Sequence, residues 1–302
     1  MSHDVCVVVN PASGRGRGSR ILPEVRRAFQ AVGVSDVRVS SAPGDERALA
    51  RQAIADGRDT LVAVGGDGTW SNVAGAILES GADCRLALLA GGTGNDFAKT
   101  VGAPCRDVHL TARLATEGGG DVRMDVGRIE HRHFLNVAGF GFDIAVLEDI
   151  ARIRWLRGPA LYYYSALRQL ARFRGVPIEV RSERGTRSAR HLMLIVANAQ
   201  RFGGSFHIAP RASLTDGMLD AISIHDAPVL RRLQLFRAAG AGAHTAMPEV
   251  TAEQASAFRL RFAAPPAYET DGEYHVAESA ELEVRCVPGA LRVVTGAEPG
   301  AA

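Results

Sequence analysis

Short apolar runs alternate with amphipathic stretches through the first half of the chain. Apolar, often β-branched runs at 5–9, 37–40, 60–64 and 85–90 predict strands, and helical spacing at 21–32, 45–56 and 71–80 predicts helices between them. Strands and helices that alternate in this way form a parallel sheet with crossover helices. Ligands of such sheets bind at the carboxyl ends of the strands. The first half is therefore predicted to be an α/β domain.

The glycine-rich segment 116–121 is predicted to link this half to a second half with a different pattern of secondary structure. The second half is mainly antiparallel β, with predicted strands at 126–129, 134–138, 178–181, 191–197, 219–224, 257–262 and 281–287 and helices at 159–174 and 229–238. A run at 291–294 predicts a strand that returns to the first domain, and 297–302 is predicted to be a frayed tail. We therefore predict domains at 1–125 and 126–288, with 289–302 returning to the first.

Composition and charge narrow the class of protein. The 302 residues are 46% hydrophobic and 23% charged, which is typical of a globular protein and excludes a disordered or fibrous chain. The formal net charge of +2 gives no basic field of the kind that binds nucleic acid. At roughly 100–200 residues per domain, the length fits one large domain or two ordinary ones.

Lysine usage excludes one kind of phosphate site. Lys99 is the single lysine, and it follows Ala98. A Walker-type P-loop needs a lysine between glycine and serine or threonine, so this chain has no such loop. Backbone amides and arginines must therefore hold any nucleotide phosphate.

The cysteines and the apolar runs indicate a compartment. The four cysteines, Cys6, Cys84, Cys105 and Cys286, are scattered and predict reduced, structural thiols. No signal-peptide pattern is evident at the N-terminus, and no apolar run reaches the roughly 20 residues of a membrane span. We expect a cytoplasmic protein without a transmembrane helix.

A glycine-rich loop that is a candidate ligand-binding site follows the strand predicted at 60–64. Residues 65–69 read Gly-Gly-Asp-Gly-Thr, in which glycines permit positive φ and consecutive amides can form an anion-binding nest. Asp67 would repel a phosphate unless a cation lay between them, so we infer Mg²⁺ bridging Asp67 and nucleotide phosphates. For one loop alone, a strand-to-helix turn capped by Asp or Thr is an equal alternative.

Two further loops of this kind strengthen the phosphate interpretation. Residues 91–97 follow the next strand, and Asn95 or Asp96 is expected to cap the helix after it. Residues 10–14 follow the first strand, with Arg15 and Arg17 to supply positive charge. Three polar glycine loops at successive strand ends favour a binding site over coincidental turns.

The motifs NPASG, GGDGT and GTGNDFA, in this order, resemble the diacylglycerol kinase catalytic family of soluble bacterial lipid kinases, which are related to sphingosine and ceramide kinases and more distantly to NAD kinases. The likeness covers nearly the whole chain, through the segments at 124–127, 134–143, 202–204, 207–210, 216–220 and 271–273. It implies an N-terminal Rossmann-like parallel α/β domain and a C-terminal antiparallel β-sandwich, the NAD kinase/diacylglycerol kinase-like fold.

The resemblance also implies ATP and Mg²⁺ as cofactors. It assigns Asp67 to a magnesium ion, and Asp216, with backbone carbonyls near Ser213 and Met218, to a second, structural magnesium site. Ser40 or Ser41 falls where the family often has a nucleotide-contacting threonine. The nucleotide-binding residues carried over are Asn10, Pro11, Ser13, Gly14, Ser40, Gly65, Gly66, Asp67, Gly68, Thr69, Gly92, Thr93, Gly94, Asn95 and Asp96.

Two carboxylates are implied to catalyse the transfer. Asp271 and Glu273 would lie across the interdomain cleft, and one of them would take the proton of the acceptor hydroxyl. Without the family context, a solvated Asp-Gly turn is the simpler interpretation. The expected reaction moves the γ-phosphoryl group of ATP to a hydroxyl of diacylglycerol or a related lipid. A NAD kinase-like enzyme and a non-catalytic nucleotide- or lipid-binding regulator stay as alternatives.

The sequence departs from the family pattern at two places. Trp70-Ser71-Asn72 stands where the family has an apolar residue followed by Asn-Glu, so one carboxylate near the phosphates is lost. Ala90-Gly91 replaces Pro-Leu before the third loop.

A basic, aromatic segment at 152–174 is a candidate membrane contact. It carries six arginines and no acidic residue, and Leu161, Tyr164, Leu167 and Ala171 share one face of its predicted helix. Such a helix fits an anionic membrane surface. The alternative is a helix that packs this apolar face on the β domain. We expect a lipid substrate, no nucleic-acid partner and peripheral contact with the inner face of the membrane; the oligomeric state is open, a homodimer included.

Overall fold

The computed structural model describes residues 4–92, 94–118, 120–153, 155–156, 159–204 and 206–296. They divide into two compact units, each of which is discontinuous in sequence. Unit 1 comprises Met1–Val126, Leu214–Asp216 and Val287–Ala302, and unit 2 comprises Gly127–Ser213 and Gly217–Cys286. Thr93 and the predicted tail at 297–302 lie outside the described residues.

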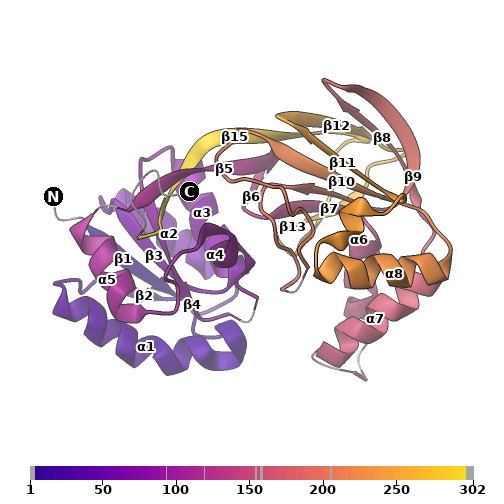
Figure 1. Cartoon of the computed structure of the whole chain (residues 1–302). Coiled ribbons are helices and arrows are strands. Elements are labelled where there is room, and N and C mark those ends of the chain that lie inside the picture. The colour runs from indigo at the N-terminus through magenta and orange to yellow at the C-terminus, as the bar shows by residue number, and fades with distance from the viewer. Residues whose placement is uncertain are drawn as a thin grey trace. The chain divides into compact units, whose positions relative to one another are not determined.

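Unit 1 is built on a parallel sheet with helices on both faces (Figure 1). The strand order is β15-β4-β3-β1-β2, and every neighbouring pair is parallel. The predicted α/β class is confirmed. Its elements are β1 (Val5–Val9), α1 (Ser13–Ala31), β2 (Val37–Val39), α2 (Asp45–Ala55), β3 (Thr60–Gly65), α3 (Asp67–Ser80), β4 (Arg85–Ala90), α4 (Asp96–Val101) and α5 (Val108–Glu117), with the first part of β5 (Asp121–Ile129) and the last part of β15 (Glu281–Val294).

Burial on both faces explains the continuous apolar runs of this sheet. In β1, Val5, Val7 and Val9 pack against α1 and α5. On the opposite face, the Trp70 indole of α3 donates to the Ala63 carbonyl at 3.1 Å. α2 and α3 pack together. The carboxyl ends of β1, β3 and β4 therefore present their glycine loops at one edge.

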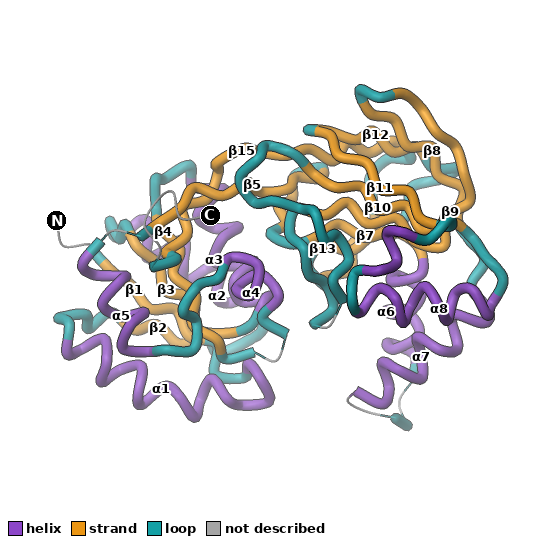
Figure 2. The backbone as a smooth tube through the Cα atoms, in the orientation of Figure 1, coloured by secondary structure: helices purple, strands orange, loops and turns teal. Residues whose placement is uncertain are grey.

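Unit 2 is an antiparallel β structure covered by helices (Figure 2). Among its described residues, neighbouring strands pair antiparallel, which agrees with the predicted β-rich second half. The elements are β6 (Arg132–Phe134), β7 (Val137–Gly141), α6 (Phe142–Arg152), α7 (Pro159–Arg172), β8 (Val176–Ser182), β9 (Gly185–Ala197), β10 (Leu219–His225), α8 (Val229–Gly240), the 3₁₀ helix η1 (Ala243–Ala246), β11 (Val250–Ala255), β12 (Ala257–Arg261), β13 (Ala267–Thr270) and β14 (Glu273–Val276).

Side-chain alternation along β9 divides unit 2 into two cores. Leu194 and Val196 face a core formed between strands, which includes Phe140, Phe258 and Tyr268. Ile195 and Ala197 face a second core that includes residues of α6, α7 and α8. The three helices therefore cover one face of the sheet.

Two strand predictions are wrong in detail. The strand predicted at 134–138 is broken into β6 and β7, because the amides of Leu135 and Asn136 donate to the Asp271 carboxylate instead of to a neighbouring strand. The strands predicted at 281–287 and 291–294 are one strand, β15, which pairs with β12 and then with β4. The Gly289 amide, at φ +57°, donates to Asp125 where the partner changes.

The chain contains no helix, among its described residues, that is long and apolar enough to cross a membrane. None of the four cysteines forms a disulfide, and Cys6, Cys84 and Cys286 are buried.

Candidate active site

The loop after β1 is organised by the Asn10 side chain. Asn10 Oδ1 accepts from the amides of Ala12 (3.0 Å) and Ser13 (3.1 Å), an Asx-type turn. Ser13 Oγ donates to the Asn10 carbonyl at 2.8 Å. Gly14 follows in the left-handed region, so the chain turns sharply before the regular part of α1 begins. This loop fits the predicted nucleotide-binding segment at 10–14.

The second loop differs from its prediction in two respects. α3 begins at Asp67 instead of at Ser71, so Asp67, Gly68 and Thr69 form the first helical turn. None of Gly65, Gly66 and Gly68 has positive φ. Glycine is needed at position 65 for space instead, since a Cβ there would lie 2.3 Å from Thr69 Oγ1.

The three loops pack backbone against backbone. Gly91 N and Gly92 N donate to the Gly65 carbonyl at 2.6 and 3.0 Å, and a Cβ on Gly92 would lie 2.5 Å from Gly66 Cα. Asn10 Nδ2 donates to Thr69 Oγ1 at 3.1 Å. The structure thus brings the predicted loops together. The amides of Gly91 and Gly92 are used within the loops, however, which leaves the first turn of α3 as the source of N–H groups for an anion.

Asp67 lies in that first turn. Its Oδ1 accepts from the Phe97 amide at 3.1 Å, which joins the second loop to α4. The donor set suits magnesium, because Mg²⁺ takes oxygen ligands and is commonly held by one or two carboxylates together with substrate phosphates. A helix N-terminus and a glycine cradle beside one carboxylate therefore fit a nucleotide with its metal ion.

Other predicted nucleotide contacts are engaged elsewhere. Ser40 is buried, and its hydroxyl donates to the buried Glu46 carboxylate at 3.0 Å. Asn95 has φ +56° and makes no side-chain cap on α4; its Nδ2 donates to the Gly92 carbonyl at 3.2 Å. Asp96 forms an ion pair with Lys99 at 3.2 Å. Of the two residues expected to cap α4, Asn95 occupies the N-cap position, but its side chain makes no hydrogen bond to the helix amides. Thr93 lies outside the described residues.

The predicted second magnesium site remains a prediction. Ser213, Asp216 and Met218 belong to the segment that precedes β10, and Asp216 is exposed. Within the described ranges, no group of three or more His, Cys, Asp or Glu side chains is placed to hold a metal ion.

Asp271 occupies a two-residue hairpin turn between β13 and β14. Asp271 (φ +51°) and Gly272 (φ +89°) both have positive φ, as the turn that suits the twist of a hairpin requires. The Asp271 carboxylate accepts from three consecutive backbone amides: Leu135 at 2.7 Å, Asn136 at 2.8 Å and Val137 at 3.1 Å. The simpler interpretation of Asp-Gly as a solvated turn is therefore wrong, because backbone amides hold the Asp271 carboxylate in place. Glu273, two residues on, is exposed.

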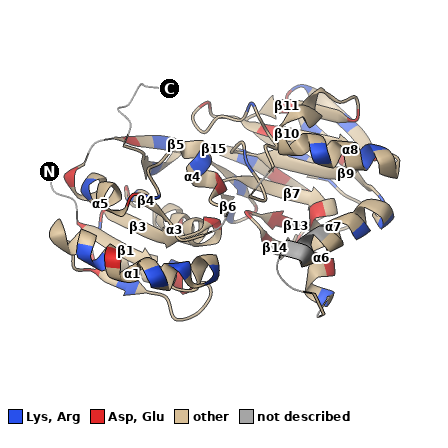
Figure 3. Ribbon diagram, turned by 60° about the horizontal axis from the view of Figure 1, so that its bottom comes forward, with Lys and Arg blue, Asp and Glu red and all other residues tan. Residues whose placement is uncertain are grey.

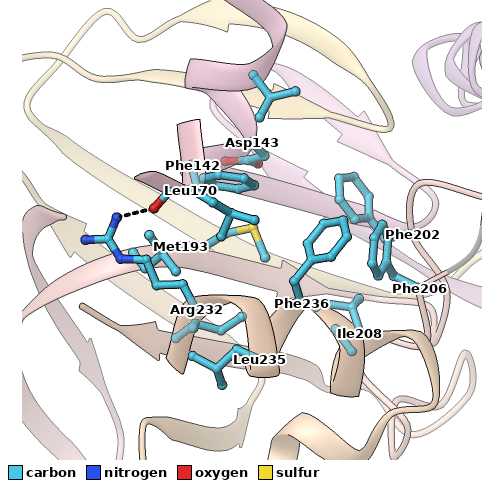
Figure 4. A pocket seen from close by; sticks show the side chains of 14 residues that line it. Phe142, Asp143, Leu170, Met193, Phe202, Phe206, Ile208, Arg232, Leu235 and Phe236 are labelled. Carbon is cyan, nitrogen blue, oxygen red and sulfur yellow. Dashed lines mark hydrogen bonds between the residues drawn. The ribbon is translucent and has the colours of Figure 1, made fainter. Parts of the chain in front are cut away.

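An apolar pocket in unit 2 was not predicted. Its cavity volume is about 60 Å³, and its walls come from α6, α7, β9, β10 and α8 and from the segment that includes Phe202 and Phe206 (Figure 4). The lining residues are Phe142, Asp143, Val146, Leu170, Leu192, Met193, Phe202, Phe206, Ile208, Ile224, Arg232, Leu235, Phe236 and Ala239. No sequence motif marks it, since no element contributes more than four residues.

Comparison with known proteins gives the family. Residues 4–129 match the Diacylglycerol kinase catalytic domain, and residues 136–295 match the YegS C-terminal NAD kinase beta sandwich-like domain. A Mycobacterium tuberculosis (strain CDC 1551 / Oshkosh) protein named Diacylglycerol kinase is 30% identical over 297 residues, 96% of this chain and 94% of that protein. A Bacillus subtilis (strain 168) protein of the same name is 25% identical and covers 89% of each chain.

Solved structures agree on the fold. The crystal structure of a diacylglycerol kinase from Bacillus anthracis str. Sterne superimposes with a TM-score of 0.76 at 21% identity, covering 98% of each chain. The predicted resemblance and fold class are thereby confirmed. With both halves matched in order and a relative at 30% identity over nearly its whole length, the chain belongs to the diacylglycerol kinase family, with a diacylglycerol kinase catalytic domain followed by a NAD kinase-like β-sandwich domain.

Proposed function

We propose that this protein is an ATP- and Mg²⁺-dependent lipid kinase that phosphorylates a hydroxyl of diacylglycerol or a related lipid. The observation that carries the proposal is the apolar pocket in unit 2, the unit that also holds Asp271. Two of its lining side chains, Asp143 and Arg232, are ionisable and the others are apolar. Such a lining suits an acyl chain, whereas a soluble dinucleotide acceptor would need polar partners along its length.

The loops of unit 1 would hold the nucleotide. The first turn of α3 offers amides that have no carbonyl partner within the helix, and its N-terminal end favours negative charge. Asn10 and Thr69, bonded to each other, would fix the loops around the phosphates. Asp67 would hold the magnesium ion, which, when bound, neutralises phosphate charge.

The acceptor hydroxyl would be activated by the Asp271 hairpin. The oxygen of the acceptor hydroxyl attacks the γ-phosphorus, and the bond from that phosphorus to the β,γ-bridging oxygen breaks, so that ADP leaves. The hydroxyl proton passes to a carboxylate. Asp271 is the better-positioned candidate because three amides fix its orientation, although they also occupy part of its lone-pair capacity. Glu273 is the alternative acceptor of the proton.

The exposed face of α7 supports membrane contact. The residues of this helix that pack inward include Ser165, Ala166 and Leu170, whereas Tyr164 (42% exposed) and Leu167 (56%) of the predicted apolar face lie at the surface. In the alternative, that face packs on the β domain, but Tyr164 and Leu167 are exposed and do not pack in this way. Trp155, 72% exposed, stacks edge-on against Tyr164 with ring centroids 5.4 Å apart.

Basic residues near this face also favour contact with an anionic membrane, but Arg168 is not one of them. Basic residues are found on α7 and α8 (Figure 3). Arg168, however, does not serve as a free cation, because it pairs with the buried Asp149 at 2.6 Å. Of the described residues, the large hydrophobic side chains that are exposed all belong to unit 2. We propose that this unit touches the membrane.

The test incubates purified protein with Mg²⁺, γ-labelled ATP and anionic mixed micelles that carry a panel of hydroxyl lipids, with NAD in a parallel tube. Label in a chloroform-soluble product supports the proposal and identifies the acceptor class. Label in NADP alone would show that the acceptor is a soluble molecule and not a lipid. ATP binding without transfer in either tube contradicts the kinase function and favours a regulator.

A further inference from the structure

The backbone between β6 and β7 is buried, although Leu135 and Asn136 belong to neither strand. Val137 follows them as the first residue of β7. Buried backbone N–H and C=O groups are nearly always paired in folded proteins, so the polar groups of this break need partners outside a regular strand. Two residues, Asp271 and Asn198, supply most of these partners.

Asp271 binds the N–H groups of the break. Its carboxylate accepts from the amides of all three residues, and its own amide donates to the Val137 carbonyl at 3.1 Å. Three N–H groups and one carbonyl of the break are therefore bound to this one residue. The directions of the three N–H groups decide where its carboxylate is held, because a hydrogen bond prefers a nearly straight N–H···O angle.

Asn198, which follows β9, binds the two carbonyls that remain. Asn198 Nδ2 donates to the Leu135 carbonyl at 2.8 Å, and the Asn198 amide donates to the Asn136 carbonyl at 2.8 Å. The Ala199 amide also donates to the Asn136 carbonyl, at 3.0 Å. The N–H and C=O groups of the break are thereby all paired.

Two rigid peptide planes connect Asn198 to Asp271. The Leu135 carbonyl and the Asn136 amide belong to one peptide unit, and the Asn136 carbonyl and the Val137 amide belong to the next. In a trans peptide, the C=O and N–H groups lie in one plane and point in opposite directions. By holding the two carbonyls, Asn198 therefore fixes the directions of the two N–H groups that bind Asp271 Oδ1.

A carboxamide is an unexpected side chain at this position. Asn198 is fully buried, and Leu194 and Val196, at the preceding alternate positions, face an apolar core. Burial of a carboxamide is unfavourable unless hydrogen bonds compensate for the lost water. A leucine would avoid that cost but would leave the Leu135 carbonyl without its donor. The side chain of Asn198 therefore serves the break between the strands more than the core.

We propose that Asn198 is a positioning residue for the proton acceptor of the reaction. Through the two peptide planes, it holds the Asp271 carboxylate in the orientation that receives the proton of the acceptor hydroxyl. This inference rests on the proposed kinase function and gives a role in it to a residue that the sequence did not mark. A displacement of a catalytic group by about 1 Å can cost about 10²-fold in rate, so the backbone that holds Asp271 affects turnover.

The kinetic test uses Asn198→Leu, which is similar in size and has no donor. It should lower kcat about tenfold and change the KM values for ATP and lipid little, because a displaced base slows transfer without weakening binding. If Asn198 acts through Asp271, the double variant with Asp271→Asn should be no slower than Asp271→Asn alone. Losses that multiply in the double variant, or an unchanged kcat in Asn198→Leu, overturn the proposal.

Ile178→Ala is the control for lost stability. Ile178 is buried in β8, in the core between strands, so this variant should lower the Tm and leave kcat unchanged. A loss of kcat in the control equal to that in Asn198→Leu would assign the effect to stability and overturn the proposal. Asn198→Asp is a second variant should Asn198→Leu not fold. It keeps the shape and, when ionised, has no proton to donate to the Leu135 carbonyl, so it should also lower kcat.

Amide hydrogen exchange separates this proposal from the kinase function. The amides of Asn136 and Val137 should exchange slowly in wild type and faster in Asn198→Leu, whereas the paired amides of β10 and β11 should stay protected. If no lipid is phosphorylated but this selective loss is seen, the kinase function fails and the positioning of Asp271 stands. Unchanged exchange at residues 136 and 137, or an equal loss of protection in β10 and β11, contradicts the positioning role.

Discussion

Asn10 Nδ2 donates to Thr69 Oγ1 at 3.1 Å, and this bond ties the loop after β1 to the first turn of α3. Asn10 also accepts two amides of its own loop, so one side chain organises two of the three loops. Asn10→Ala should lower the free energy of unfolding by about 1 kcal/mol and weaken ATP binding, because the amides of Ala12 and Ser13 lose their acceptor. Denaturant titration and calorimetry of ATP binding measure the two effects. Asn10→Asp keeps the acceptor, so equal losses in both variants would contradict the role of the Asx turn.

The close approach of two loops predicts the effect of one methyl group. Gly92→Ala should distort the cradle, since its Cβ would lie 2.5 Å from Gly66 Cα, and overpacking of this kind costs about 1–3 kcal/mol. The stabilisation of the protein by ATP in a thermal unfolding scan should fall strongly. Gly240→Ala is the matched control, because its Cβ would meet nothing within 4 Å. Equal behaviour of the two variants would show that the cradle tolerates side chains.

The carboxylates of the hairpin are distinguishable by mutation. Asp271→Asn should reduce turnover by at least about 10²-fold, the usual contribution of a positioned acid or base, with ATP affinity unchanged. Glu273→Gln, a matched change on an exposed side chain of the same hairpin, should reduce turnover only slightly. Steady-state kinetics with γ-labelled ATP decide the matter. The reverse pattern would transfer the role of proton acceptor to Glu273. The same assay with Asp67→Ala should show no transfer, while circular dichroism shows an intact fold.

Asp143 and Glu269 are buried beside each other at Gly139, and this acid pair predicts how stability changes with pH. The pKa of Asp143 is raised by burial from 3.8 to about 7, so the folded state binds protons more tightly than the unfolded state between these values. Stability from this group therefore falls as pH rises through that window. Asp143→Asn removes the effect, and its Tm relative to wild type should increase between pH 5 and pH 8. A Tm difference that is constant over this range would mean that Asp143 is ionised throughout.

The exposed side chains of α7 predict membrane affinity. Leu167→Glu should reduce sedimentation of the protein with anionic phospholipid vesicles severalfold, because it removes apolar contact and adds a repelling charge. Gln30→Glu, an equal change of charge on the exposed face of α1, is the control. Binding should also weaken as salt is raised. Loss of binding in the control alone would locate the membrane contact on unit 1.

The strands of unit 1 were predictable because both faces of its sheet are buried. Val5, Val7 and Val9 meet one helical layer while Cys6 and Val8 meet the other, so the apolar run is continuous and short. Loop positions followed from the same pattern. The conformation of the loops did not follow from this pattern. The glycines at 65 and 66 are needed for space and not for positive φ, and the sequence does not show which of the two applies because the neighbouring loop decides it.

The acceptor pocket could not be predicted in this way. Met193, Phe202 and Phe236 are ordinary apolar residues in their own elements, and they meet only after α8 packs on the sheet. Asp143 ends the family-like segment 134–143, but nothing in the sequence indicates that it meets Glu269. Their meeting depends on the register of β7 with β13, which is set by long-range pairing.

The course of β15 has a consequence for biosynthesis. Its first residues pair with β12 and its last, Arg292 and Val293, pair with β4, where Arg292 also binds Asp121 and Asp83. The parallel sheet of unit 1 therefore lacks this edge strand until residues 292 and 293 have been synthesised. A fragment that ends before residue 290 would therefore expose the open edge of β4 to other chains.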